Sequence, residues 1–289
     1  MKVLVTGSNG QLGSEIKELV SYYSQLEFIF KDLPDLDICY ADLLNTFVIE
    51  NKINAVINCA AYTSVDEAEE NFEIAEEVNS IGVQNLINAL EKVNGKLIHI
   101  STDYVFDGSN SEPYKESDHV NPLCVYGKTK RDGELFVINS SIDSIVIRTS
   151  WLYSSFGNNF VKSMIRLGNE KKSLSVIYDQ IGTPTYGRDL AKVCMDIIST
   201  SENEWISNKG KVYHYSNEGV ASWYDLAKTV IQLFRSNCKV KAIQSKDYPT
   251  KAKRPQYSVL NKTKIKNDFN IEIPFWKDSL KECINKIMK

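Results

Sequence analysis

Apolar residues recur along the chain with two alternating periods. Short continuous runs, beginning with Val3-Leu4-Val5, have the character of buried strands, and longer segments carry apolar residues at helical spacing, as at Leu12, Ile16 and Leu19. The runs predict strands at residues 2–6, 28–30, 55–59, 96–101, 144–148, 174–178 and 212–216. The helical spacing predicts helices at residues 11–23, 41–52, 66–93, 127–139, 158–167, 189–198 and 222–234. Strands and helices therefore alternate through the first half of the chain.

A glycine-rich turn joins the first predicted strand to the first predicted helix. It reads Thr6-Gly-Ser-Asn-Gly-Gln-Leu-Gly13, so Gly7, Gly10 and Gly13 are spaced as Gly-x-x-Gly-x-x-Gly. Such glycines allow a tight bend and a close approach of the backbone to a pyrophosphate, which the free N–H groups of the helix then bind. We interpret the turn as a variant of the dinucleotide-binding fingerprint. The alternative is a glycine-rich turn without a ligand, which its place after a buried strand disfavours.

An acidic residue follows the second predicted strand. Asp32 lies 19 residues beyond Gly13, close to the spacing of about 20 at which an acid holds the adenosine ribose. A carboxylate at this point favours NADH, whereas Lys31 beside it could meet the 2′-phosphate of NADPH. The sequence therefore leaves both NADH and NADPH as candidate cofactors.

The alternation predicts an α/β fold, with a Rossmann-type, doubly wound parallel sheet and helices on both of its faces. We expect residues 1–150 to form the NAD(P)-binding domain. Residues 151–289, with shorter elements, should form mainly a smaller, interleaved substrate-binding lobe, from which the helix near 187–200 returns to the sheet. Ligands of such folds lie beyond the carboxyl ends of the strands. Gly7, Ala61, Thr102 and Trp151 all follow predicted strands.

Tyr126 and Lys130 are the candidate catalytic pair. They lie four residues apart, about one helical turn, so both side chains project from one helix face. There the ammonium group should lower the phenol pKa from its free value of about 10, as a general acid requires. The pattern Tyr-x-x-x-Lys is weak by itself, and it gains weight from the glycine turn upstream.

Composition and residue patterns narrow the range of expected partners and compartments. The chain has 289 residues, 43% of them hydrophobic, and a formal net charge of −3. The sequence has no basic block, no apolar run of membrane-spanning length and no signal-peptide pattern, so we expect no nucleic-acid or membrane partner. Its six cysteines form no Cys-x-x-Cys pair, which is typical of reduced thiols in the cytoplasm.

Seven ordered segments resemble the dTDP-4-dehydrorhamnose reductases, a family of the extended short-chain dehydrogenase/reductase superfamily. The resemblance covers nearly the whole chain. The segments begin at Thr6, Asn58, Ser101, Tyr126, Arg148, Asp179 and Arg254, and read TGSNGQLG, NCAAYTSVD, STDYVFDG, YGKTK, RTSWLY, DQIGTPT and RPQYSVL.

The resemblance implies reduction of the 4-keto group of dTDP-4-dehydro-L-rhamnose to dTDP-L-rhamnose. Tyr126 would be the proton donor, Thr102 would hydrogen-bond the same oxygen, and Lys130 would hold the nicotinamide ribose. The positions similar to cofactor contacts are Gly7, Gly10, Gln11, Leu12, Gly13, Asp32, Asp37, Ile38, Ala61, Tyr62, Thr63, Tyr126 and Lys130. Those similar to sugar contacts are Val65, Thr102, Asp103, Tyr104 and Trp151.

Several further expectations come from the resemblance. Tyr62 stands where relatives often carry histidine, which leaves a role for its side chain open. Some relatives are thought to bind magnesium at a homodimer contact, where Glu15 is the candidate ligand. Trp151 could stack on the sugar ring or be a core aromatic.

The alternatives are a reductase of another nucleotide-linked 4-keto-6-deoxy sugar, a dehydratase or epimerase of the superfamily, and a non-catalytic subunit like the β-subunit of methionine adenosyltransferase. Dehydratases resemble Thr-Asp-Glu where this chain has Thr102-Asp103-Tyr104. Without the glutamate, elimination loses its base.

Overall fold

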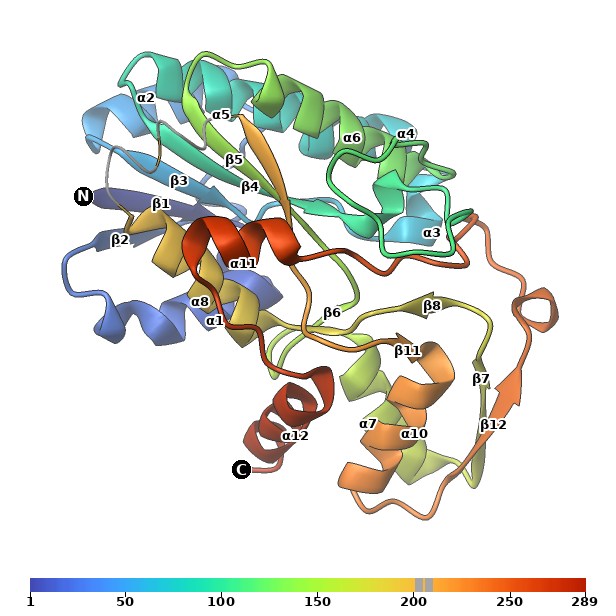
Figure 1. Ribbon diagram of the computed structural model, residues 1–289. Helices are drawn as coiled ribbons and strands as arrows, with labels where there is room; N and C mark the ends of the chain where they lie inside the picture. Colours follow the sequence, from blue (N-terminus) through green and yellow to red (C-terminus); the bar gives the residue numbers. More distant parts are fainter. Residues whose placement is uncertain (201–204, 206–209) are drawn as a thin grey trace.

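The computed structural model describes residues 1–200, 205 and 210–289, and a six-stranded sheet lies at its centre (Figure 1). All pairings in this sheet are parallel, in the order β10-β5-β4-β3-β1-β2. Its strands are β1 (Lys2–Thr6), β2 (Glu27–Phe30), β3 (Ala55–Asn58), β4 (Lys96–Thr102), β5 (Asp143–Thr149) and β10 (Lys211–His214). The predicted doubly wound parallel α/β fold is confirmed.

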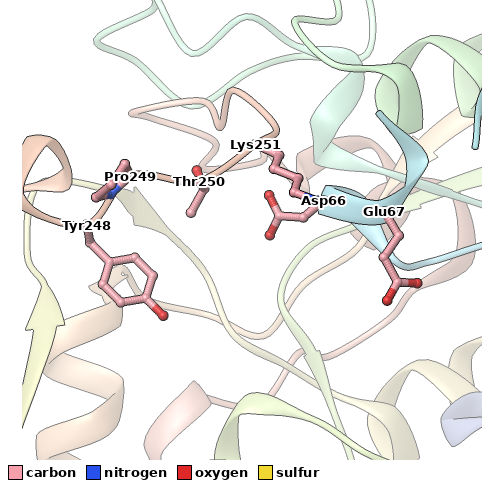
Figure 2. Close-up of a pocket in the computed structure, with 6 residues that line it drawn as sticks. All are labelled: Asp66, Glu67, Tyr248, Pro249, Thr250 and Lys251. Carbon is pink, nitrogen blue, oxygen red and sulfur yellow. The ribbon is translucent and has the colours of Figure 1, made fainter. Parts of the chain in front are cut away.

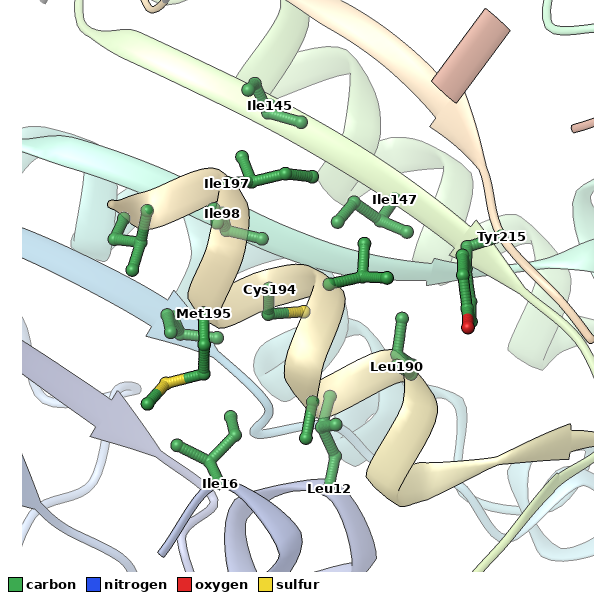
Figure 3. Close-up of a cluster of buried hydrophobic side chains, with 14 of the residues drawn as sticks. Leu12, Ile16, Ile98, Ile145, Ile147, Leu190, Cys194, Met195, Ile197 and Tyr215 are labelled. Atoms are coloured by element: carbon green, nitrogen blue, oxygen red, sulfur yellow. The ribbon is translucent and has the colours of Figure 1, made fainter. Parts of the chain in front are cut away.

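Helices cover both faces of the sheet because side chains of the buried strands project to either side. One face carries α1 (Gln11–Leu19) and α8 (Gly187–Ile198), and Figure 3 shows α8 side chains among Ile98 and Ile147 of the sheet and Ile16 of α1. The other face carries α2 (Ala41–Glu50), α5 (Gly82–Glu91) and α6 (Val125–Ile138).

A second lobe has its own apolar core. The core is formed by α7 (Phe160–Glu170), α10 (Trp223–Leu233) and α12 (Trp276–Ile287) with the parallel pair of β7 (Ser173–Ile177) and β12 (Lys239–Ile243). The short strands are β6 (Leu152–Tyr153) with β9 (Thr185–Tyr186), and β8 (Ile181–Gly182) with β11 (Ala221–Ser222). Within the described part of the chain, no helix has both the length and the apolar character needed to cross a membrane.

The two lobes share chain segments. α8 leaves the second lobe and packs beside α1 on the sheet. β10 then pairs with β5 and becomes the edge strand of the main sheet. The chain therefore crosses between the lobes more than once, and the second lobe is attached to the sheet by paired backbone.

The predicted helix over 66–93 is wrong as a single element. It consists of α3 (Val65–Ala68), α4 (Phe72–Glu76), a π-helical turn η2 (Glu77–Ile81) and α5. The break falls at the polar stretch before Asn71, whose backbone N–H and side-chain amide both donate to the carbonyl of Glu67 and close the first turn. Local hydrogen bonding of this kind competes with continued helix.

The predicted elements ended at residue 234, although β12, α11 (Thr263–Phe269) and α12 follow. β12 reads KVKAI and is largely exposed, so it has no apolar run to reveal it. The spacing of Trp276, Leu280 and Ile284 in α12 is helical and was overlooked.

Candidate active site

The predicted site residues gather at the carboxyl edge of the main sheet. Gly7 follows β1, Ala61 follows β3, Thr102 ends β4 and Trp151 follows β5. Thr6 is in register with Asn58, and Thr102 with Thr149. The strand ends are therefore neighbours, and the loops after them meet along one edge.

The glycine turn has no space for side chains at two of its positions. Gly7 has a φ of +59°, and a Cβ there would lie 2.6 Å from the backbone nitrogen of Ala60. A Cβ on Gly13 would lie 2.5 Å from the Cα of Ser8. Beyond Gly10 the helix α1 begins, and the first N–H groups of a helix lack intrahelical partners. The turn thus fits a dinucleotide pyrophosphate.

Asp32 lies beside the glycine turn. Its Oδ2 accepts from the backbone N–H of Asn9 at 2.7 Å, and its Oδ1 accepts from that of Leu33 at 2.8 Å. Asp37 instead accepts from the backbone N–H of Cys39 at 2.9 Å, while the side chains of Ile38 and Leu12 are buried in the core. Asp32 is therefore the acidic residue at the turn, and the side chains of Ile38 and Leu12 serve packing.

The loop 60–63 is held by a residue that the sequence did not reveal. Asn79, fully buried in η2, accepts from the backbone N–H of Tyr62 at 2.9 Å and donates to the Tyr62 carbonyl at 3.1 Å. Its amide also donates to Thr129 of α6 at 3.1 Å. The loop containing Ala61 and Thr63 is thus fixed through the backbone of Tyr62, which does not depend on the Tyr62 side chain. A lone asparagine in a helical region gave no signal of this role.

The structure brings the three predicted catalytic residues together. Tyr126 and Lys130 lie in the first turns of α6, and Thr102 lies near enough to the Tyr126 phenol to lower its pKa. Lys130 is buried and donates from Nζ to the carbonyl of Ile100 at 2.7 Å. Gly127 lets the start of α6 touch the backbone of Tyr104, since a Cβ there would overlap the Tyr104 carbonyl oxygen.

Burial dominates the electrostatics of this group. It raises the pKa of Tyr126 above its ordinary value; the neighbouring Thr102 hydroxyl opposes this rise, and the nearby Asp103 adds to it. Burial also lowers the pKa of Lys130 to about 8. The prediction that Lys130 lowers the pKa of Tyr126 is therefore wrong. A high phenol pKa keeps the proton on Tyr126 at neutral pH, where a donor must hold it.

Two of the predicted sugar contacts adjoin the catalytic residues. Asp103 is buried, and its Oδ1 accepts from the Thr102 hydroxyl at 3.2 Å. Burial raises the pKa of Asp103 to about 6, against side-chain hydrogen bonds from Ser258 and Thr102. The Tyr104 ring meets the Tyr126 ring edge-on, with centroids 5.6 Å apart. Val65, half-buried, begins α3.

Trp151 is held in an unusual backbone conformation, with a φ of +48°. Its indole stacks on that of Trp223, with ring centroids 3.7 Å apart and planes 7° from parallel. One face of Trp151 is therefore covered by protein, so stacking on a sugar is limited to the other face. Trp223 was missed because it lies 72 residues away in the sequence and no motif connects the two.

Glu15 is an ion-pair residue within the chain. It is fully buried and accepts from the Ser154 hydroxyl at 2.6 Å, with Lys286 Nζ at 3.3 Å and Arg188 Nη1 at 3.9 Å. Two cations thus compensate the carboxylate. In residues 1–200, 205 and 210–289, no group of three or more His, Cys, Asp or Glu is placed to hold a metal ion. The magnesium site expected at Glu15 has no support.

Comparisons with known proteins agree over the full length. Residues 1–289 match the model of the family described as RmlD substrate binding domain. A protein of Aggregatibacter actinomycetemcomitans named dTDP-4-dehydrorhamnose reductase is 43% identical over 288 residues, which cover 97% of each chain.

Solved structures extend the likeness to three dimensions. A dTDP-4-dehydrorhamnose reductase from Clostridium acetobutylicum has a TM-score of 0.94 at 43% identity, with 100% of both chains covered. One from Bacillus anthracis, in complex with NADP, has a TM-score of 0.93 at 36% identity, with 99% of both chains covered.

Proposed function

The chain belongs to the RmlD substrate binding domain family, and from this membership we propose that it reduces the 4-keto group of dTDP-4-dehydro-L-rhamnose with a reduced nicotinamide cofactor, giving dTDP-L-rhamnose. The observation that carries the proposal is the full-length likeness to proteins named as such reductases. The placement of Thr102 near the Tyr126 phenol, with Lys130 one helical turn further along α6, supports it independently.

The glycine turn and its neighbours are the proposed cofactor site. The N–H groups at the start of α1 would bind the pyrophosphate, Asp32 the adenosine ribose and Lys130 the nicotinamide ribose. When bound, the reduced nicotinamide supplies the hydride for C4. The complex of the Bacillus anthracis relative with NADP supports a nicotinamide cofactor. Lys31, next to Asp32, is the cation that a 2′-phosphate would meet, so NADPH and NADH are both assigned as candidates.

The proton comes from the chain itself. As C4 is reduced, its oxygen gains negative charge, and Tyr126 donates its phenolic proton to that oxygen. Thr102, near the same phenol, would stabilise the oxygen with a hydrogen bond. Proton donation from a positioned acid contributes typically about 10²–10⁴-fold in rate.

Elimination of water would need a base at the position where the dehydratases carry a glutamate, and this chain has none at that position. Tyr104 occupies the position of the dehydratase glutamate, and burial raises its pKa well above neutral. A protonated phenol does not abstract a proton from a sugar carbon. The site is therefore better suited to reduction than to loss of water.

The test is direct turnover by the full chain. Enzymatically generated dTDP-4-dehydro-L-rhamnose is supplied with NADPH or NADH, oxidation of the cofactor is followed by the loss of its absorbance, and the product sugar is identified. We expect oxidation of at least one cofactor and dTDP-L-rhamnose as the product. Turnover only with another nucleotide-linked 4-keto-6-deoxy sugar would reassign the substrate, and no turnover with any of them would favour a non-catalytic subunit.

A further inference from the structure

Two segments of the second lobe contact the lobe that contains the main sheet. Residues 248–251 face Asp66 and Glu67 of α3 across a hollow of about 300 Å³ (Figure 2), and Arg254 donates to the Asp66 carboxylate at 3.1 and 2.6 Å. The side chains of this ion pair are 20% and 41% exposed, and pairs with this much access to water are weak. The second segment, residues 154–159, lies against α1 and is called the inter-lobe loop below.

The inter-lobe loop follows one face of α1 to the first residue of that helix. The Ser154 hydroxyl donates to Glu15 Oε1 at 2.6 Å, and the Asn159 side-chain amide donates to Gln11 Oε1 at 3.0 Å. Gln11 and Glu15 lie one helical turn apart, so the loop is attached to one face of α1 at two points. Gln11 is the first residue of α1, where the N–H groups have no intrahelical partner. The loop therefore reaches the place proposed for the cofactor pyrophosphate.

Gly157 allows the inter-lobe loop to approach Gln11 closely. Its φ is +61°, in the left-handed region that favours glycine, and a Cβ there would lie 3.1 Å from Gln11 Cγ and 3.9 Å from the Gln11 backbone nitrogen. Gln11 itself is half-buried. The loop from the second lobe thus restricts the space in which the Gln11 side chain can turn.

The hydrogen bonds of Asn159 determine which end of the Gln11 amide faces the loop. The backbone N–H of Lys162 donates to Asn159 Oδ1 at 3.0 Å, and Asn159 Nδ2 donates to the carbonyl oxygen of Ser154 at 2.8 Å. A backbone N–H can only donate and a carbonyl can only accept, so the two ends of the Asn159 amide are distinguished. Nδ2 then requires an acceptor from Gln11, and that acceptor is Oε1.

This arrangement leaves the amide nitrogen of Gln11 for a ligand. Within residues 1–200, 205 and 210–289, Gln11 Nε2 has no hydrogen-bond partner. A pyrophosphate presents only oxygen acceptors, so the N–H end of an amide attracts it and the oxygen end repels it. Because Asn159 holds Oε1, the donors of Gln11 are available at the start of α1, where the proposed cofactor carries its negative charge.

Capping of the next helix does not by itself require asparagine at this position. Asn159 is the N-cap of α7 and accepts there from the backbone N–H of Lys162, a role that serine or aspartate fills equally well. Aspartate has no donor for Gln11, and the side chain of serine is one bond shorter than the amide. Asparagine therefore combines the cap with the contact to Gln11.

We propose that Asn159 is a positioning residue for the cofactor: reaching from the second lobe, it holds the Gln11 amide with its N–H groups directed toward the pyrophosphate. The inference rests on the cofactor site of the proposed function. It assigns Asn159 itself no contact with the cofactor.

The first test compares two substitutions in the inter-lobe loop by titration with NADPH. Asn159→Ser keeps the helix cap and the net charge but cannot reach Gln11, so the Kd for NADPH should rise by about tenfold, as expected for a lost hydrogen bond to a charged group. Ser154→Ala is the matched control. It removes the attachment of the loop to Glu15, whose carboxylate keeps Lys286 at 3.3 Å, and should change the Kd by less than about twofold. An Asn159→Ser chain that binds NADPH as tightly as the Ser154→Ala chain would overturn the proposal.

ADP separates the pyrophosphate from the rest of the cofactor. It carries the adenosine and the pyrophosphate without the nicotinamide ribose, so Asn159→Ser should raise the Kd for ADP by the same factor as the Kd for NADPH. An unchanged Kd for ADP would mean that Gln11 does not serve the pyrophosphate, which would contradict the proposal.

A double-mutant cycle distinguishes the positioning of Gln11 from a purely structural role of the loop. Gln11→Ala removes the amide, so adding Asn159→Ser to it should change the Kd for NADPH little, although Asn159→Ser alone weakens binding. An equal effect of Asn159→Ser in both backgrounds would show that the loop acts without Gln11, and the inference would then be wrong.

These titrations also keep the inference separable from the proposed function, because binding needs no turnover. A chain that binds NADPH but does not reduce the sugar nucleotide fails the proposed function alone, and the double-mutant cycle still decides the role of Asn159. A chain that binds neither NADPH nor ADP would overturn both.

Discussion

The proposed cofactor side and the proposed substrate side of this site are constructed differently. On the proposed cofactor side, the surfaces offered to a ligand are mainly backbone: the glycine turn, the start of α1 and the loop whose Tyr62 backbone is held by Asn79. On the proposed substrate side they are side chains, with Trp151 stacked on Trp223 and the Tyr104 ring edge-on to Tyr126. A backbone site depends on the absence of side chains, whereas a side-chain site depends on the identity of each one.

This difference predicts that substitutions can weaken cofactor binding and sugar binding separately. The largest effect should come from Gly7→Ala. A Cβ at Gly7 would lie 2.6 Å from the Ala60 nitrogen, and the φ of +59° is unfavourable for alanine. Either the turn or the loop after β3 must move, so we expect the Kd for NADPH to rise by about 100-fold, about 3 kcal/mol, which is within the usual cost of a strained backbone position.

Isothermal titration calorimetry with NADPH measures this. A Gly7→Ala chain that binds NADPH as tightly as the unmodified chain does would refute the backbone site.

The converse change is Trp151→Ala. It should lower kcat/KM for the sugar nucleotide by about 10²-fold while NADPH affinity changes little, since a poorly held ketone is misplaced with respect to Tyr126. Trp223→Ala should have a smaller effect in the same direction, because it removes the support of Trp151 and not the proposed contact itself.

Thermal melts and NADPH titration on both variants distinguish a sugar contact from a tryptophan that serves only the core. A tryptophan that serves only the core would cost roughly 3–5 kcal/mol of stability when truncated and would weaken both ligands together. Normal activity per folded molecule in Trp151→Ala would remove it from the sugar site.

A smaller effect should appear in the pH dependence of stability. Burial raises the pKa of Asp103 to about 6, so the native state binds its proton more tightly than the unfolded state does. The cost of burying the carboxylate is absent below about pH 4, grows between pH 4 and 6, and is complete above that range. Asp103→Asn should therefore stabilise the chain by at most about 3 kcal/mol at pH 7 relative to its effect at pH 4. Urea unfolding at both pH values gives the difference, and an equal effect at both would show that Asp103 ionises normally.

The smallest effect should be that of Asp32→Ala on cofactor choice. A carboxylate accepts from ribose hydroxyls and repels a 2′-phosphate, so the KM for NADH should rise more than that for NADPH, by a few-fold to about tenfold. Because Asp32 also accepts from Asn9 of the glycine turn, both KM values should rise. Initial rates with each cofactor measure the ratio, and an unchanged ratio would exclude Asp32 from the ribose site.

The same difference explains which parts of the molecule could be predicted from the sequence. The sheet, the glycine turn, Asp32 and the Tyr126–Lys130 pair depend on local spacing and on the rule that parallel strands end at one edge, so the residues alone indicated them. The stacking of Trp223 on Trp151 and the contact of Arg254 with Asp66 join segments 72 and 188 residues apart, and no local period encodes them.

The pKa of Tyr126 was mispredicted for a related reason. Charge spacing along a helix can be derived from the sequence, but burial by packed neighbours cannot, and burial is the larger effect at Tyr126. Asn79 was missed because its role depends on a loop that folds back onto η2.

The central claim is that Tyr126 donates the proton during reduction of the sugar ketone. Tyr126→Phe removes the phenol oxygen and little else. With dTDP-4-dehydro-L-rhamnose and saturating NADPH, the account predicts that single-turnover reduction slows by about 10²–10⁴-fold while the Kd for NADPH is unchanged. Reduction at a near-normal rate by a folded, NADPH-binding Tyr126→Phe chain would contradict it.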